Sequence, residues 1–200
     1  MFGDISQATI FFLILAAFSA GLVDAIAGGG GLIQLPALLI GLPQASTVEV
    51  LGTNKVASIF GTSASALMYR RSVKTDANFL ASMAIPAFFG SVLGALSASK
   101  IPTQSMRPIV FILLVAVAIY TWRKPDLGAI ELLRHETKKR FSISALAGLV
   151  IGFYDGIFGP GTGSFLMLTL IYLGFAFLSA SAIAKVVNVS TNLGAILVFG

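Results

Sequence analysis

Two stretches of this 200-residue chain resemble each other: "GLVDAIAGGGGLI", residues 21–33, and "GFYDGIFGPGTGS", residues 152–164. Each is apolar around one aspartate, and a glycine run begins four residues after that aspartate. When Gly21 is aligned with Gly152, the aspartates coincide, as do one isoleucine and three of the glycines. A match of this kind between distant parts of one chain predicts an internal duplication.

A second pair of segments supports the duplication. Lys55 and Lys185 align at an offset of 130 residues, against 131 for the aspartates, so a single one-residue gap reconciles the two registers. Polar residues follow each lysine at the third and seventh positions, which share one face of a helix with it. They are Ser58 and Thr62 in the first copy, and Asn188 and Asn192 in the second.

Composition places both copies in a membrane. The chain is 56% hydrophobic and 10% charged, with a mean hydropathy of +0.94, whereas about a quarter of the residues of a soluble domain are charged. A bilayer span needs about 20 predominantly apolar residues. A large soluble core would instead need helices with charged outer faces. Uncharged runs that reach or approach spanning length cover residues 5–23, 25–48, 77–99 and 156–184.

The expected elements occur twice in the same order. The first copy contains spans and one short apolar piece. The second copy begins with the same elements in the same order. The short piece in each copy predicts an interrupted or re-entrant helix. In chain order we expect a span at 5–27, a short piece at 32–42, spans at 47–69, 77–99 and 104–122, a span at 141–158, a short piece at 164–178 and a span from 181.

This order divides the chain into a first transmembrane repeat (1–122), a basic loop (123–140) and the first part of a second repeat (141–200). The fold class is therefore an all-α integral membrane protein, a multi-pass bundle built from a duplicated module. Counterparts of the spans at 77–99 and 104–122 are missing from the second repeat. We expect that this chain is truncated within it; the alternative is that another copy supplies those spans.

Charge placement predicts the topology. Eleven of the 13 Lys and Arg residues lie in or beside connections between expected spans, and six of them lie in the loop 123–140. Cytoplasmic loops are rich in Lys and Arg, so we expect this loop, and the loop 70–74 two spans away, on the cytoplasmic side. The connection 100–107 then lies opposite. His135, the only histidine, falls in the solvated loop, where a catalytic role is not expected.

Several functional classes do not fit. The absence of cysteine excludes disulfides and thiolate metal sites, and basic residues confined to loops do not form a nucleic-acid-binding stripe. An intramembrane enzyme would need a nucleophile and a base within the apolar segments. Neither glycine run matches the dinucleotide-binding pattern, and neither follows a strand. We expect neither an enzyme nor a cofactor.

The glycine runs have two interpretations. In hydrocarbon, a broken helix persists only where it is buried in protein or lines a wet cavity, and its freed N–H groups attract anions at the start of the next helix. Glycines can also simply allow close helix packing. Two runs in register favour a site, because paired interrupted segments indicate a transporter's substrate site. We expect unusual backbone dihedrals at Gly30 and Gly161.

Two lysines support an anion site. Lys55 and Lys185 are the only basic residues well inside apolar spans, where a lysine costs about 2.5–3.5 kcal/mol. Snorkelling towards the interface is the alternative, especially for Lys55. Flanking amides, together with the cations, suit a small anion with several acceptor oxygens: Asn54, Asn188 and Asn192.

Two aspartates, Asp24 and Asp155, are the only acids well within the apolar spans. They could pair with the lysines as structural salt bridges, or one could carry a coupling proton. The sequence leaves both roles open, and with them the direction of transport.

Four segments together resemble the sulfite exporter TauE/SafE family, in its YfcA-like branch, over essentially the whole chain: "GLVDAIAGGGGLIQLPALL", "GTNKVAS", "GFYDGIFGPGTGSF" and "AKVVNVSTNLG". The resemblance implies a multi-pass protein of the bacterial plasma membrane that moves small sulfur-containing or organic anions, such as sulfite and sulfonates. The family's characteristic positions correspond here to Asp24, Gly28, Gly29, Gly30, Gly31, Asn54, Lys55, Asp155, Gly159, Gly161, Lys185 and Asn188.

We therefore predict a transporter of a small anion that works by alternating access, with its site between the two repeats. The expected substrate site comprises the positions named above and Asn192. A passive anion channel would use the same lysines and backbone amides without alternating access. A carrier saturates and shows counterflow, whereas a channel conducts passively, so flux measurements separate the two.

Overall fold

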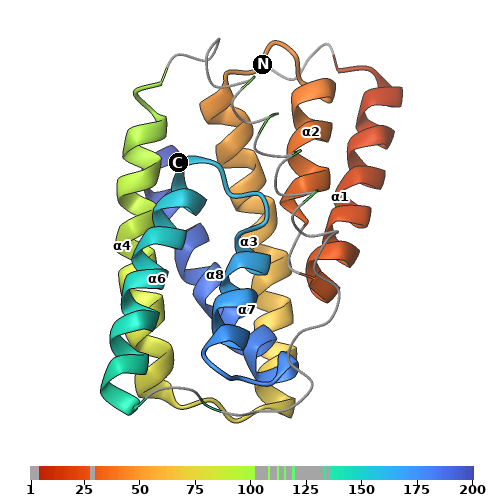
Figure 1. Cartoon of the computed structure of the whole chain (residues 1–200). Helices are drawn as coiled ribbons and strands as arrows, with labels where there is room; N and C mark the ends of the chain where they lie inside the picture. The colour runs from red at the N-terminus through yellow and green to blue at the C-terminus, as the bar shows by residue number, and fades with distance from the viewer. Residues whose placement is uncertain are drawn as a thin grey trace.

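The computed structural model describes residues 5–27, 30–101 and 136–200, together with residues 108, 112, 115, 119 and 133. Within these ranges the regular structure consists of seven α-helices, which confirms the all-helical prediction (Figure 1). Most of the expected span at 104–122 and most of the basic loop lie outside the described residues. The helices are α1 (Gln7–Ala27), α2 (Gly31–Gly41), α3 (Thr47–Ser72), α4 (Ala77–Ala98), α6 (Thr137–Ile157), α7 (Thr162–Tyr172) and α8 (Phe177–Phe199).

Four of these helices, α1, α4, α6 and α8, are long and apolar enough to cross a membrane. The short pieces form α2 and α7, of 11 residues each. At 26 residues α3 is long enough, but it is not among the four. It carries buried polar side chains at Asn54, Lys55 and Thr62, which lower its hydropathy. That α3 crosses the bilayer therefore stays a prediction.

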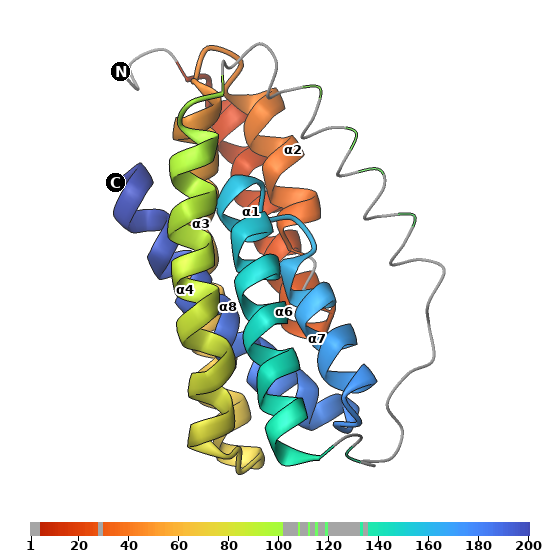
Figure 2. The same cartoon turned by 60° about the vertical axis from the view of Figure 1, so that its left-hand side comes forward.

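The helices after α4 match the first three in length but run the other way. α1 and α6 both have 21 residues, α2 and α7 both have 11, and α3 and α8 have 26 and 23. Figure 1 shows α1 and α3 descending while α6 and α8 ascend, and Figure 2 shows the same arrangement from the side. The match agrees with the predicted duplication, which itself stays a prediction.

Local signals explain where α3 and α4 start. Ser46 and Glu49 form a reciprocal capping box at the N-terminus of α3, with Oγ of Ser46 accepting from the backbone of Glu49 at 3.2 Å. The side chain of Asp76 caps α4 by accepting from the backbone N–H of Asn78 at 2.9 Å. Each cap follows a loop in which the chain reverses direction before the next helix begins (Figure 1).

Glycine packing joins α4 to α6. The backbones approach so closely that a Cβ added at Gly152 would overlap the carbonyl oxygen of Ala87, and one at Gly90 would overlap that of Leu149. Such contacts are the usual way for membrane helices to pack tightly. Side chains tie α4 to α8 as well: Ser91 Oγ donates to the carbonyl of Thr191 at 2.6 Å. α4, α6 and α8 thus form one closely packed group.

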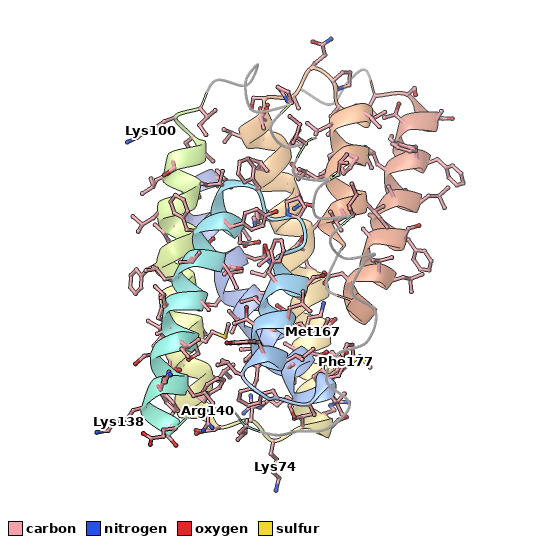
Figure 3. All side chains as sticks on the ribbon, viewed as in Figure 1. Lys74, Lys100, Lys138, Arg140, Met167 and Phe177 are labelled. Atoms are coloured by element: carbon pink, nitrogen blue, oxygen red, sulfur yellow. The ribbon has the colours of Figure 1, made fainter. Side chains whose placement is uncertain are left out.

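Basic residues lie at both ends of the bundle. Lys74, Lys138 and Arg140 lie at one end, and Lys100 lies at the other (Figure 3). The described parts of the loops 70–74 and 123–140 are therefore on the same side, as the charge pattern predicts. That this side faces the cytoplasm follows from the positive-inside rule and stays a prediction.

Candidate functional site

The two interrupted segments meet inside the bundle. The break between α1 and α2 ends at Gly30, and the break between α6 and α7 ends at Gly161. A Cβ added at Gly31 would lie 3.2 Å from Cα of Pro160, so the start of α2 lies against the backbone of the second break. The N-termini of α2 and α7, with their positive dipole ends, consequently lie in one interior region.

Glycine is required at the two breaks for different reasons. Gly161 has φ +79° and Gly159 has φ +90°, a left-handed conformation that glycine adopts readily. Gly30 has φ −56°, an ordinary helical value, so the prediction of unusual dihedrals there is wrong. Gly30 is needed for a close approach instead, because a Cβ would lie 2.6 Å from Cβ of Asp24.

Side chains fix the second break. Tyr154 donates its hydroxyl hydrogen to the carbonyl of Pro160 at 2.7 Å, and Thr162 Oγ1 donates to the carbonyl of Gly159 at 2.8 Å. The ring of Phe165 packs edge-on against that of Tyr154, with centroids 5.4 Å apart. In the predicted duplication Val23 aligns with Tyr154, so the first break has no equivalent of this hydroxyl contact.

Two ion pairs cross between the halves of the chain. Lys55 on α3 lies 2.6 Å from Oδ2 of Asp155 on α6, and Lys185 on α8 lies 2.9 Å from Oδ2 of Asp24 on α1. Each lysine therefore pairs with the aspartate of the other half. Lys55 is only 1% exposed, so it does not snorkel. The sequence left two roles open for the aspartates, a structural salt bridge or a coupling proton. The described structure contains the salt bridges, because each aspartate pairs with a lysine.

The two pairs differ in their surroundings. Lys185 also donates to the main-chain carbonyl of Asp24 and so holds the end of α1. The ammonium of Lys55 contacts Oδ2 of Asp155 as a buried ion pair. A Cβ added at Gly159 would lie 2.8 Å from Nζ of Lys55, which places this ammonium directly against the second break.

A polar seam joins α3 and α8. Asn192 Nδ2 donates to Oγ1 of Thr62 at 3.4 Å, and these two residues occupy equivalent positions in the predicted repeats. On α8, Oγ1 of Thr191 donates to the carbonyl of Asn188 at 3.0 Å. Oδ1 of Asn54 is buried and accepts no hydrogen bond from the described residues, so this amide has unused capacity beside Lys55.

A small cavity lies among these groups. The volume open to the centres of water molecules is about 20 Å³, which is room for about one water. No large apolar side chain contributes to the wall within the described residues. Most of the predicted site residues line it: Asp24, Gly31, Asn54, Lys55, Asp155, Gly159, Gly161, Asn188 and Asn192.

The other predicted residues have different positions. Gly30 is beside the cavity, donating its N–H to Oδ1 of Asp24 at 3.4 Å, and Lys185 holds the same aspartate from α8. Gly28 and Gly29 lie outside the described residues. The prediction omitted three lining residues, Ser58, Thr62 and Gly163. The first two were detectable, because they follow Lys55 at the spacing that identified Asn188 and Asn192.

Gly161→Val is expected to abolish anion transport while the protein still inserts into the membrane. A β-branched residue is strongly disfavoured at φ +79°, so the N-terminus of α7 should move. Uptake into vesicles and the amount of membrane-inserted protein are measured together. Leu197→Val is the control, because that side chain is 73% exposed on α8 and does not line the cavity. Normal anion binding by the Gly161→Val variant would place the anion elsewhere.

Comparison with known proteins gives related sequences along the whole bundle. Residues 13–200 match the family described as "Sulfite exporter TauE/SafE". The chain is 42% identical to "Probable membrane transporter protein ORF9" of Sinorhizobium sp, with 98% of this chain and 74% of that protein covered. It is 37% identical to a "Probable membrane transporter protein" of Haemophilus influenzae (98% and 76% covered) and 36% identical to "Probable membrane transporter protein YfcA" of Escherichia coli (98% and 71%). No solved structure matches the chain.

Proposed function

Because this chain belongs to the sulfite exporter TauE/SafE family of membrane transporters, we propose that its central cavity carries a small anion across the bilayer. The crossed ion pairs are the observation that carries this proposal. They place the ammonium of Lys55 where the N-termini of two broken helices meet. A buried cation beside two positive dipole ends is suited to a negatively charged ligand.

The lining suggests what kind of anion fits. Donors surround the cavity on several sides: the ammonium of Lys55 and the amides of Asn54, Asn188 and Asn192. An oxyanion with several acceptor oxygens can use these donors together. The family name points to sulfite, and an organosulfonate presents the same sulfur-bound oxygens. We propose a sulfur oxyanion of this type as the substrate.

Alternating access is the proposed mechanism. The cavity holds about one water, so an anion of the size of sulfite enters only when the surrounding helices move apart. The two halves run in opposite directions and meet at the equivalent residues Thr62 and Asn192. In transporters built from inverted repeats, one half rocks against the other around a central site. This geometry favours a carrier over a channel with a fixed pore.

The charges suggest proton coupling. Lys55, Lys185, Asp24 and Asp155 sum to zero when all four are ionised. An anion that binds Lys55 takes the place of Asp155, and leaving that carboxylate ionised and unpaired in the interior would be costly. Uptake of one proton by Asp155 restores neutrality. We propose that this proton travels with the anion when the transporter works in the uptake direction.

Asp155→Asn is expected to make anion flux insensitive to an imposed pH gradient while counterflow persists. An amide occupies the same space but cannot take up a proton, so the variant should bind the anion equally well at acidic and at alkaline pH. Flux is followed in vesicles whose membrane potential is clamped. Asp76→Asn, at the exposed cap of α4, is the control. If flux through the unmutated protein ignores the pH gradient, coupling is absent and potential-driven export is favoured.

The decisive test of the function is counterflow. Vesicles containing the protein are loaded with unlabelled sulfite and diluted into radiolabelled sulfite, and a transient accumulation of label that saturates with concentration is expected. Methanesulfonate and acetate, added as competitors, rank sulfonates and carboxylates. A passive current without counterflow would support an anion channel instead. Absence of both would contradict an anion site in the cavity.

A further inference from the structure

One face of the bundle, formed by α1 and α3, carries a group of small residues that the described helices leave uncovered. We call it the α1–α3 face. A Cβ added at Gly21 on α1 or at Gly61 on α3 would meet no described atom within 4 Å. The residues of this face are all exposed: Ala17 and Gly21 on α1, and Thr53, Ala57, Gly61 and Ala64 on α3.

The equivalent face of the second half is covered. In the repeat register, Ala17 and Gly21 correspond to Gly148 and Gly152 of α6, both of which are buried against the backbone of α4. A Cβ at Gly194 of α8 would lie 2.6 Å from the carbonyl oxygen of Phe88 on α4. The counterpart of the α1–α3 face on α6 and α8 is therefore covered by α4, whereas no described helix covers the α1–α3 face itself. The four α3 residues correspond to positions of α8 that are all buried: Ile183, Val187, Thr191 and Gly194.

Lipid is a poor partner for this face. α3 is not among the helices that are apolar enough to cross a membrane by themselves. Its four residues on this face are no larger than threonine, whereas its large exposed side chains are Val56, Phe60, Leu67 and Met68. Small residues are typical of helix–helix contacts within membranes because they let backbones approach. One difference separates the two faces: Phe60, 73% exposed, stands where α8 has Ser190. Despite this large ring, a Cβ added at Gly21 or Gly61 meets no described atom within 4 Å.

We infer that the α1–α3 face binds a transmembrane helix of the α4 type, one that presents small residues to this face as α4 presents Gly90 and Gly94 to α6. Roughly a quarter of each of the three relatives lies outside the match, which is long enough to contain such a helix, since a membrane helix needs only about 20 residues. Bound there, the helix would pack on α1 and α3 as α4 packs on α6 and α8. The inference rests on the duplication and is independent of what the cavity transports.

A fluorescent reporter on the face tests this directly. The chain contains no cysteine, so Gly61→Cys provides one thiol for an environment-sensitive dye in lipid nanodiscs. The probe is a synthetic peptide with the sequence of residues 77–98, because α4 is the described helix of the required type. We expect the peptide to shift the emission of the dye in the Gly61→Cys variant. A dye in the Leu197→Cys variant, on an exposed part of α8, should be unaffected.

The contact face of the peptide supplies the matched control. A peptide in which both Gly90 and Gly94 are replaced by leucine should no longer shift the emission, because bulky residues prevent close backbone approach. No shift with the native peptide, or an equal shift with both peptides, would overturn the inference. A shift that grows with the protein-to-lipid ratio in the absence of peptide would also overturn it, since a second copy would then occupy the face. None of these readouts depends on flux.

Discussion

Lys55→Ala is expected to reduce anion binding about 100-fold or more and to abolish transport while the protein remains in the membrane. The variant removes the only described ammonium that lines the cavity. Truncating one partner of a buried charge pair typically costs about 2–5 kcal/mol in binding, and about 2.7 kcal/mol corresponds to roughly 100-fold. Binding of radiolabelled sulfite to purified protein gives the affinity, and vesicle uptake gives the transport rate.

Three companion variants separate binding from structure. Lys55→Arg keeps the charge and should also impair transport, because a planar guanidinium does not replace a compact ammonium. Lys55→Ala combined with Asp155→Ala leaves no buried unpaired charge, so the double variant should regain thermal stability without regaining binding. Lys185→Ala should also lose transport, since α1 loses its tie to α8. Unchanged transport in both single alanine variants would leave the lysines with structural roles only.

Gly152→Leu is expected to prevent stable folding of the bundle. Any side chain at this position overlaps the carbonyl oxygen of Ala87, and because that atom belongs to the backbone of α4, whole helices must separate. Overpacking typically costs about 1–3 kcal/mol, and the cost should lie at or above the top of that range here because backbone rather than side-chain atoms must move. The thermal unfolding temperature in detergent is the measurement, and Gly152→Ala should show a smaller loss in the same direction.

Gly21→Leu is the matched control for that variant, because Gly21 is the repeat equivalent of Gly152. A side chain there meets nothing within 4 Å in the described part of the chain, and leucine is the better helix former. Its unfolding temperature should equal that of the unmutated chain or exceed it. Equal losses at Gly21 and Gly152 would show that the contact with α4 is not what makes Gly152 sensitive.

The helix pattern was largely predictable because it depends on local properties of the chain. Apolar runs and charged connections place the ends of α4 and α6 within a few residues of their predicted positions. The helix predicted at 47–69 is present as α3, but hydropathy alone does not identify it as a spanning helix, because its polar residues face the cavity and the α1–α3 face. Hydropathy averages over all faces of a helix and therefore does not register that different faces meet different neighbours.

By itself, the sequence determined that this is a helical membrane protein with two interrupted segments in register, and that Asp24, Lys55, Asp155 and Lys185 are the charges within its apolar segments. Only the tertiary structure decided which charges meet. Within each predicted repeat the aspartate and the lysine are about 30 residues apart, yet each pairs across to the other half of the chain. Spacing along the chain reports the face of a helix, whereas pairing depends on how separate helices pack, and here the two halves pack in opposite directions.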